Sequence, residues 1–259
     1  MVGTQTLRAL VATLTFSVAI VLSASSAIAQ DLFELEVFEA ELTSPGTFDV
    51  DLHTNVMTRG GVKLPPSNGS HRPAHVSVEV IRGWTDRIET AGFIQTAPFS
   101  SSGPRLAGGH VRTKIRFGEL MGLKFAGGAE YGFNRAAFSG EFQTLEYRQI
   151  VDFRQGRLSL LVNPAVEIVT QGSEEGLEPV FDISAKAAWR LSERIALTTD
   201  YFSAEATTRH LQPEMSAHHL LFAGTDLDLG SGWELTVSVG HCVTSSEPWL
   251  MKSVIGYGF

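Results

Sequence analysis

Residues 110–117, HVRTKIRF, decide the fold class, because apolar and polar side chains alternate at every position. On an extended strand, one face carries Val111, Thr113, Ile115 and Phe117, and the other carries His110, Arg112, Lys114 and Arg116. A period of two predicts a β-strand with one apolar face and one polar face.

The same alternation recurs along the chain. Twelve segments share it: 46–56, 75–84, 87–97, 109–117, 123–133, 142–153, 157–169, 178–191, 194–204, 217–229, 233–241 and 249–259. The pattern is weakest in 217–229, where Leu220, Leu221 and Phe222 stand in a row. The sequence therefore predicts an all-β fold of about twelve strands.

The connections between these segments alternate in length. Five are tight: 84–86, 118–122, 154–156, 192–193 and 230–232. Six are longer and richer in Gly, Pro and Ser: 57–74, 98–108, 134–141, 170–177, 205–216 and 242–248. This regularity predicts a transmembrane up-and-down antiparallel β-barrel, with short periplasmic turns and long outward loops. A Greek-key sandwich has less regular connections.

The N-terminus has the pattern of a secretory signal peptide. Residues 9–22 are apolar and follow Arg8, and Ala27 and Ala29 are small. The run is shorter than the roughly 20 residues of a transmembrane helix, so we expect cleavage after Ala29. The predicted organisation is a signal peptide (1–29), an N-terminal periplasmic lead-in (30–45) and a transmembrane β-barrel (46–259). Within the lead-in, residues 31–42 would also suit a short strand or a plug.

The polarity of the alternation distinguishes a barrel in lipid from a barrel in water. A soluble barrel points its apolar face inward, whereas here the polar face is rich in small residues and in charges of both signs. Aromatic residues fall at the ends of the segments, as expected of two membrane–water interfaces. The expected interface residues are Trp84, Phe117, Phe153, Trp189, Trp233, Trp249 and Tyr257.

Composition excludes several classes of function. The formal net charge of −8 argues against nucleic acid as a partner. Cys242 is the single cysteine, which excludes a disulfide framework and a cysteine zinc cluster. His218 and His219 are adjacent in a predicted strand and point to opposite faces, so neither these residues nor nearby His210 suggest a metal site. No nucleophile motif is recognisable, so we expect no enzyme, no metal and no cofactor.

The chain ends with Ile255, Tyr257 and Phe259 on the apolar face of the last segment. This ending resembles the C-terminal signature of bacterial outer-membrane β-barrels, which the barrel-assembly machinery recognises. The resemblance implies a location in the Gram-negative outer membrane after cleavage near Ala29. It also implies outer-membrane lipid and the assembly machinery as partners.

Four shorter stretches carry a narrower resemblance. They are 45–53 (PGTFDVDLH), 83–87 (GWTDR), 146–153 (EYRQIVDF) and 160–164 (LLVNP). These stretches are similar to a family of outer-membrane transporters described as phenol-degradation MetA-pathway-like. The resemblance implies passage of a solute and identifies no ligand.

The polar face predicts a mixed-charge, acid-rich lumen. The expected solute path comprises Arg112, Lys114, Arg116, Glu130, Glu146, Arg148, Asn163, Glu167, Asp182 and Lys186. Opposed stripes of acids and bases would orient a solute in transit. Alternatively, the charges pair with one another and fill a narrow barrel. Pro164 predicts either a bulge that aims Asn163 into the lumen or a harmless irregularity.

The predicted function is an outer-membrane channel or transporter for small solutes. Two alternatives stay open at this point. One is a closed barrel with a structural or surface-interaction role and no transport. The other is an outer-membrane enzyme that modifies lipid.

Overall fold

The computed structural model describes residues 35–57, 74–97, 105–135, 139, 141–172, 179–204, 218–243 and 249–259. The predicted signal peptide and its cleavage site lie outside the described residues, as does His210. Within these ranges, no helix has the length and apolar character needed to cross a bilayer.

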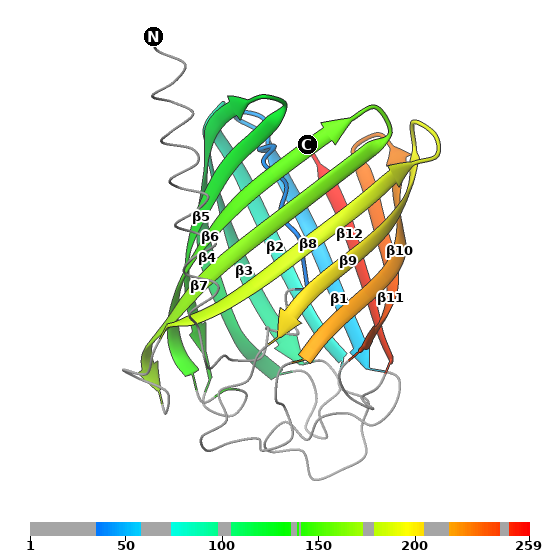
Figure 1. Cartoon of the computed structure of the whole chain (residues 1–259). Helices are drawn as coiled ribbons and strands as arrows, with labels where there is room; N and C mark the ends of the chain where they lie inside the picture. Colours follow the sequence, from blue (N-terminus) through cyan, green and yellow to red (C-terminus); the bar gives the residue numbers. More distant parts are fainter. Residues whose placement is uncertain are drawn as a thin grey trace.

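Twelve strands form one closed antiparallel barrel, in which each strand pairs with its neighbours in the chain (Figure 1). The strands are β1 (Phe48–Met57), β2 (Ala74–Thr85), β3 (Ile88–Ala97), β4 (Arg105–Leu120), β5 (Leu123–Asn134), β6 (Glu141–Gln155), β7 (Leu158–Gly172), β8 (Val180–Arg190), β9 (Ile195–Ala204), β10 (His218–Gly230), β11 (Trp233–Cys242) and β12 (Trp249–Gly258). The all-β, twelve-stranded prediction is confirmed.

The barrel closes between β1 and β12. Their register runs from Asp49 opposite Gly258 to Met57 opposite Leu250. Phe48 and Phe259 exchange both backbone hydrogen bonds, at 2.9 and 2.8 Å. Closure leaves no strand edge unpaired, which a sheet in lipid requires.

The β4–β5 hairpin differs most from the prediction. β4 begins at Arg105 and continues through the expected connection at 118–122 to Leu120. A register shift between Arg116 and Gly118 accommodates one extra residue, and the strand then resumes. The turn itself is only Met121 and Gly122, both with positive φ, the geometry that suits the twist of a two-residue hairpin.

The barrel is inside-out in polarity, as the alternation predicts. Large apolar side chains such as Val111 and Ile94 are 57% and 58% exposed on the outer wall. Charged side chains such as Glu79 and Asp152 are 1% and 0% exposed on the inner wall. An outer wall of this composition suits a hydrocarbon environment.

Pro164 produces an interruption of one ladder and not a bulge. The β7–β8 register is continuous through Pro164, which lies opposite Ile183. On the β6 side no pair forms at Pro164, yet the pairing resumes in the same register on either side. Proline lacks the N–H that a ladder requires, and alternation alone turns Asn163 into the lumen. The bulge prediction is therefore wrong.

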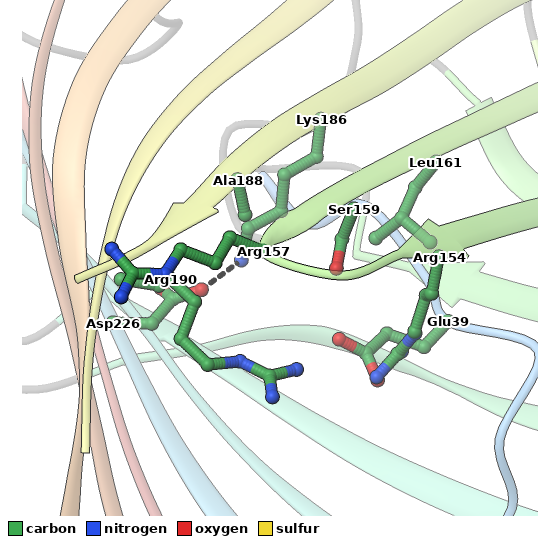
Figure 2. Close-up of a pocket in the computed structure, with 10 residues that line it drawn as sticks. Glu39, Arg154, Arg157, Ser159, Leu161, Lys186, Ala188, Arg190 and Asp226 are labelled. Carbon is green, nitrogen blue, oxygen red and sulfur yellow. Dashed lines mark hydrogen bonds and ion pairs between the residues drawn. The ribbon is translucent and has the colours of Figure 1, made fainter. Parts of the chain in front are cut away.

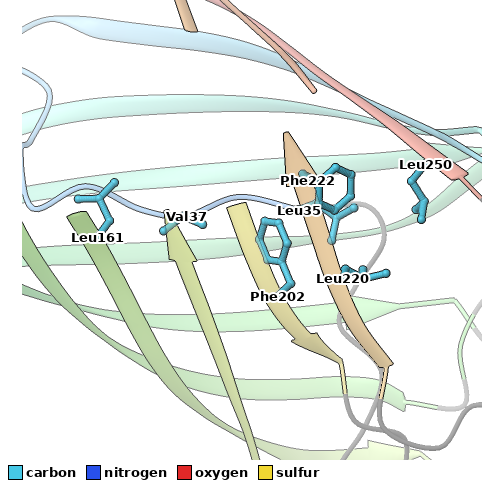
Figure 3. Packing of buried hydrophobic residues seen from close by; sticks show 7 residues of the cluster. All are labelled: Leu35, Val37, Leu161, Phe202, Leu220, Phe222 and Leu250. Carbon is cyan, nitrogen blue, oxygen red and sulfur yellow. The ribbon is translucent and has the colours of Figure 1, made fainter. Parts of the chain in front are cut away.

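Residues Leu35–Thr43, which we call the lumen segment, lie inside the barrel. Seven buried apolar residues form one cluster between the segment and the wall (Figure 3): Leu35, Val37, Leu161, Phe202, Leu220, Phe222 and Leu250. Of the three possibilities for residues 31–42, a plug describes this part of the chain. The expected lead-in outside the barrel does not describe residues 35–43.

The lumen segment also accounts for the weak alternation of β10. Leu220 and Phe222 both face inward, because the inner wall there is apolar and packs against Leu35 and Val37. Gly240 of β11 lies under the Phe222 ring, where a Cβ atom would stand 2.3 Å from that ring. Glycine is therefore required for Phe222 to lie across the wall.

The chain passes from the lumen segment into β1 at the end of the barrel that carries the short turns. Residues 44–47 cross β2 at Gly83, which exchanges backbone hydrogen bonds with Gly46 and Thr47 at 2.9 and 3.2 Å. A Cβ atom on Gly83 would lie 2.2 Å from the carbonyl oxygen of Ser44. Only glycine allows this close approach.

Candidate functional site: the lumen and its internal segment

Asn163 anchors the middle of the lumen segment. The Phe38 N–H donates to Asn163 Oδ1 at 2.6 Å, and Asn163 Nδ2 donates to the Phe38 carbonyl at 3.1 Å. The Asn163 side chain thus satisfies both backbone groups of a residue that forms no strand. Asn163 is 0% exposed, so water does not compete for these bonds.

Two arginines from the barrel wall hold the Phe38 ring. The guanidinium carbon of Arg112 lies 4.0 Å from the ring centroid, and that of Arg148 lies 5.3 Å from it. Both contacts are within the range of a cation–π interaction. Three residues of the predicted solute path, Arg112, Arg148 and Asn163, therefore converge on one residue of the lumen segment.

Polar contacts continue towards the short-turn end. The Ala40 N–H donates to Asp152 at 3.3 Å, and the Thr43 N–H donates to Glu89 at 2.7 Å. Glu39 pairs with Arg154 at 2.5 Å. The segment thus uses its backbone donors as well as its side chains to contact the wall.

Glu41 lies between two cations of the wall. Its carboxylate accepts a hydrogen bond from Lys124, and Arg116 lies 3.7 Å away. The Lys124 hydrogen bond lowers the pKa of Glu41 against the opposing effect of burial, and the charge of Lys124 lowers it further. Lys124 and Arg116 therefore favour the ionised form of this carboxyl group.

Two of the predicted path residues on β4 pair with acids of the two preceding strands. Arg112 lies 2.5 Å from Glu79 of β2, and Lys114 lies 2.8 Å from Glu89 of β3. Lys114 and Glu89 lie on adjacent strands, and Arg112 reaches past β3 to Glu79 on β2. These acids and bases therefore pair along the same part of the wall and do not face each other across the lumen. The interpretation as mutually paired charges describes this part of the wall better than opposed stripes do.

The remaining predicted path residues also face the lumen. Arg148 forms two bonds of 2.8 Å to Glu146 and lies 3.9 Å from Asp182. Glu130 lies 3.4 Å from His110. Glu130, Glu146 and Glu167 occupy paired positions on β5, β6 and β7, which places three carboxylates in a row.

One group in the described residues has the ligand types for a divalent cation. Side-chain atoms of Glu36, His53 and Glu79 lie within 4.8 Å of one another. His53 lies 3.4 Å from Glu79 and 4.0 Å from Glu36. Arg112 already supplies a cation to Glu79, so the group is accounted for as an ion-pair network that joins the lumen segment to β1 and β2.

A cavity of about 140 Å³ lies between the lumen segment and the wall, towards the short-turn end (Figure 2). Its lining residues are Glu39, Arg154, Arg157, Ser159, Leu161, Lys186, Ala188, Arg190, Ala196 and Asp226. Four of these residues carry a positive charge and two a negative charge. Lys186, a predicted path residue, pairs there with Asp226 at 2.6 Å.

Sequence reasoning missed the contribution of Arg154, Arg157 and Arg190 to this cavity. The alternation of 157–169 and 178–191 assigns Arg157 and Arg190 to the polar face. Their positions at strand ends gave no reason to group them. The register supplies that reason, because it places Leu158 opposite Trp189 and so brings the adjoining residues, Arg157 and Arg190, together.

The predicted interface aromatics all lie at strand ends. Trp84, Trp189, Trp233 and Trp249 are exposed on the outer wall, as is Phe117, while Phe153 and Tyr257 are half-buried. Ile255, Tyr257 and Phe259 also share that wall, and Tyr257 stacks on Phe259 at 5.7 Å. Their roles at the lipid interface and in barrel assembly stay predictions.

The fold is similar to those of solved outer-membrane proteins. An outer-membrane channel from Pseudomonas putida F1 has a TM-score of 0.60 at 8% identity, covering 87% of this chain and 100% of that one. The KdgM porin has a TM-score of 0.58 at 8% identity, covering 82% and 99%. The NanC porin has a TM-score of 0.57 at 8% identity, covering 80% and 98%.

No protein-family profile matches the chain, and no curated protein matches it. The narrower resemblance to MetA-pathway-like transporters therefore stays a prediction. At 8% identity, the structural likeness carries the fold alone. The chain has the closed-barrel fold of outer-membrane porins and channels.

Proposed function

We propose that this chain is an outer-membrane channel for small solutes in which the lumen segment restricts the path. One observation carries the proposal: the segment occupies the lumen without being part of the barrel. All twelve strands pair without it. Among the described residues, the first ladder contact of the chain is the bridge between Pro45 and Gly83, which lies at the rim after the segment has ended.

The contacts of the segment support a reversible restriction. Asn163, Asp152 and Glu89 hold backbone groups that water could solvate equally well. Exchange of protein–protein for protein–water hydrogen bonds changes the free energy by only about 1 kcal/mol per bond. These three hydrogen bonds therefore add little to the cost of leaving the site, to which the buried apolar cluster and the Glu39–Arg154 ion pair also contribute. Departure of the segment would break no strand of the barrel.

The cellular setting belongs to the same proposal. The apolar outer wall suits lipid, and the fold is shared with outer-membrane channels. We place the barrel in the outer membrane after removal of residues 1–29, with the short turns in the periplasm. Outer-membrane lipid and the barrel-assembly machinery would be its partners, and a small molecule its solute.

Conductance in a planar bilayer tests the proposal. The mature chain is compared with a variant that lacks residues 31–42 and keeps Thr43, whose contacts with Asp49 and Glu89 lie at the entry to β1. We expect the variant to open in larger and more frequent steps than the intact chain. Circular dichroism and heat-dependent gel mobility verify that both barrels are folded. Silent bilayers from two folded barrels would support a closed structural barrel and overturn the channel.

A further inference from the structure

We propose that the cavity beside the lumen segment binds a small oxyanion, the carboxylate or phosphate group of a solute, between Arg157 and Arg190. That this anion is part of a solute in transit rests on the proposed channel function. The binding site itself rests on the geometry of the cavity (Figure 2).

Arg157, directly before the start of β7, lies opposite Arg190, the last residue of β8. The Arg190 N–H donates to the Arg157 carbonyl at 2.8 Å, next to the pair formed by Leu158 and Trp189. Side chains opposite each other in an antiparallel pair have Cβ atoms about 5 Å apart, and like charges at such positions repel. An anion between the two guanidinium groups would relieve this repulsion.

The acids of the cavity are already committed to other cations. Asp226 receives Lys186 on one carboxylate oxygen at 2.6 Å and the Thr236 hydroxyl on the other at 2.8 Å. Glu39 pairs with Arg154. Within the part of the chain that the structure describes, the Arg157 and Arg190 side chains form no hydrogen bond or ion pair. Two cationic groups of the cavity are therefore available to a ligand.

The chemistry of the guanidinium group defines the ligand class. Its planar fork of N–H donors matches the paired oxygens of a carboxylate or a phosphate. The Ser159 hydroxyl lines the same cavity and adds a donor that is half-buried in the wall. A cavity of about 140 Å³ admits a group of this size.

Isothermal titration of the purified mature chain in detergent tests the site, with inorganic phosphate and acetate titrated separately at low ionic strength. We expect at least one of the two anions to bind, and the pair of titrations shows which oxyanion the site prefers. The double variant Arg157→Gln with Arg190→Gln should lose at least tenfold in affinity. The matched control carries Arg87→Gln and Arg194→Gln, which lie in short turns of the same rim outside the cavity. The control should bind within twofold of the unmodified chain.

Two results would overturn the site: no binding of either anion at millimolar concentration, or equal affinities in the double variant and its control. The titration requires no membrane and no transport. A barrel that binds phosphate but conducts nothing would leave the site standing and refute the channel. A conducting barrel that binds neither anion would refute the site and leave the channel standing.

Discussion

Replacement of Asn163 by alanine should loosen the lumen segment while leaving the barrel intact. The substitution removes both hydrogen bonds to Phe38, which are 2.6 and 3.1 Å long. It removes no strand hydrogen bond, because the side chain alone is changed. The two arginine contacts to the Phe38 ring and the apolar cluster around Leu35 would remain.

The magnitude follows from the two backbone groups left behind. A buried donor or acceptor that loses its partner costs about 1–3 kcal/mol. Two such groups give about 2–6 kcal/mol, and entry of water into the space left by the amide brings the cost to about 2–4 kcal/mol. Since about 1.4 kcal/mol corresponds to a factor of ten, local opening at Phe38 should become roughly 30- to 1,000-fold more frequent.

Hydrogen exchange of the Phe38 amide, measured by NMR on the labelled barrel in micelles, reads out this opening directly. The matched control is Thr198→Ala, which truncates a buried inner-wall residue whose hydroxyl forms no hydrogen bond within the described residues. We expect the control to exchange within threefold of the unmodified chain. If Asn163→Ala left Phe38 exchange unchanged while the β7 amides stayed protected, the anchoring role of Asn163 would be refuted.

Three further predictions concern the entry to β1, the charge on the segment and the outer wall. Gly83→Val should displace the chain at Ser44, because a Cβ atom at position 83 would lie only 2.2 Å from the Ser44 carbonyl oxygen. We expect faster proteolysis between the segment and β1 in this variant, and an unchanged cleavage rate would contradict the prediction. Glu41 has a lowered pKa, so its stabilising contact with Lys124 is fully present above about pH 4.3 and is lost as pH falls through the lowered value. After correction for the intrinsic pH dependence of amide exchange, the protection of the segment amides should therefore fall in acid, and less steeply in Glu41→Gln; identical pH profiles of protection would count against this contact. Val111→Arg should destabilise the barrel by about 2–4 kcal/mol, since Val111 is 57% exposed on the outer wall. Urea unfolding from lipid vesicles measures this loss, and an unchanged unfolding midpoint would argue against a lipid-facing position.

The strands could be predicted because alternation reports the environment of each residue directly. In 110–117 every position lies on the face that the pattern assigns, with Val111 outside and Arg112 inside. The same rule placed Asn163 in the lumen. Even the weak pattern at Leu220–Phe222 was informative, because its cause is an apolar contact inside the barrel.

The contents of the lumen could not be predicted in the same way. Periodicity says which face a residue occupies but not what fills the space in front of it. Phe38 and Asn163 are 125 positions apart, and no local pattern links them. Arg157 and Arg190 become neighbours only through the register of β7 and β8. The residues were assigned to the correct face, whereas their partners depend on tertiary structure.

The accessibility of residue 40 tests most directly whether the lumen segment occupies the barrel. In a background with Cys242→Ser, Ala40→Cys is compared with Ser44→Cys, because Ala40 is 0% exposed inside the barrel and Ser44 is exposed at the rim. Both barrels are treated with a bulky, membrane-impermeant maleimide, folded and after denaturation. We predict that the thiol at position 40 reacts at least 100-fold more slowly than the thiol at position 44 in the folded barrel, and equally fast after denaturation. Equal rates at the two positions in the folded barrel would contradict a segment seated in the lumen.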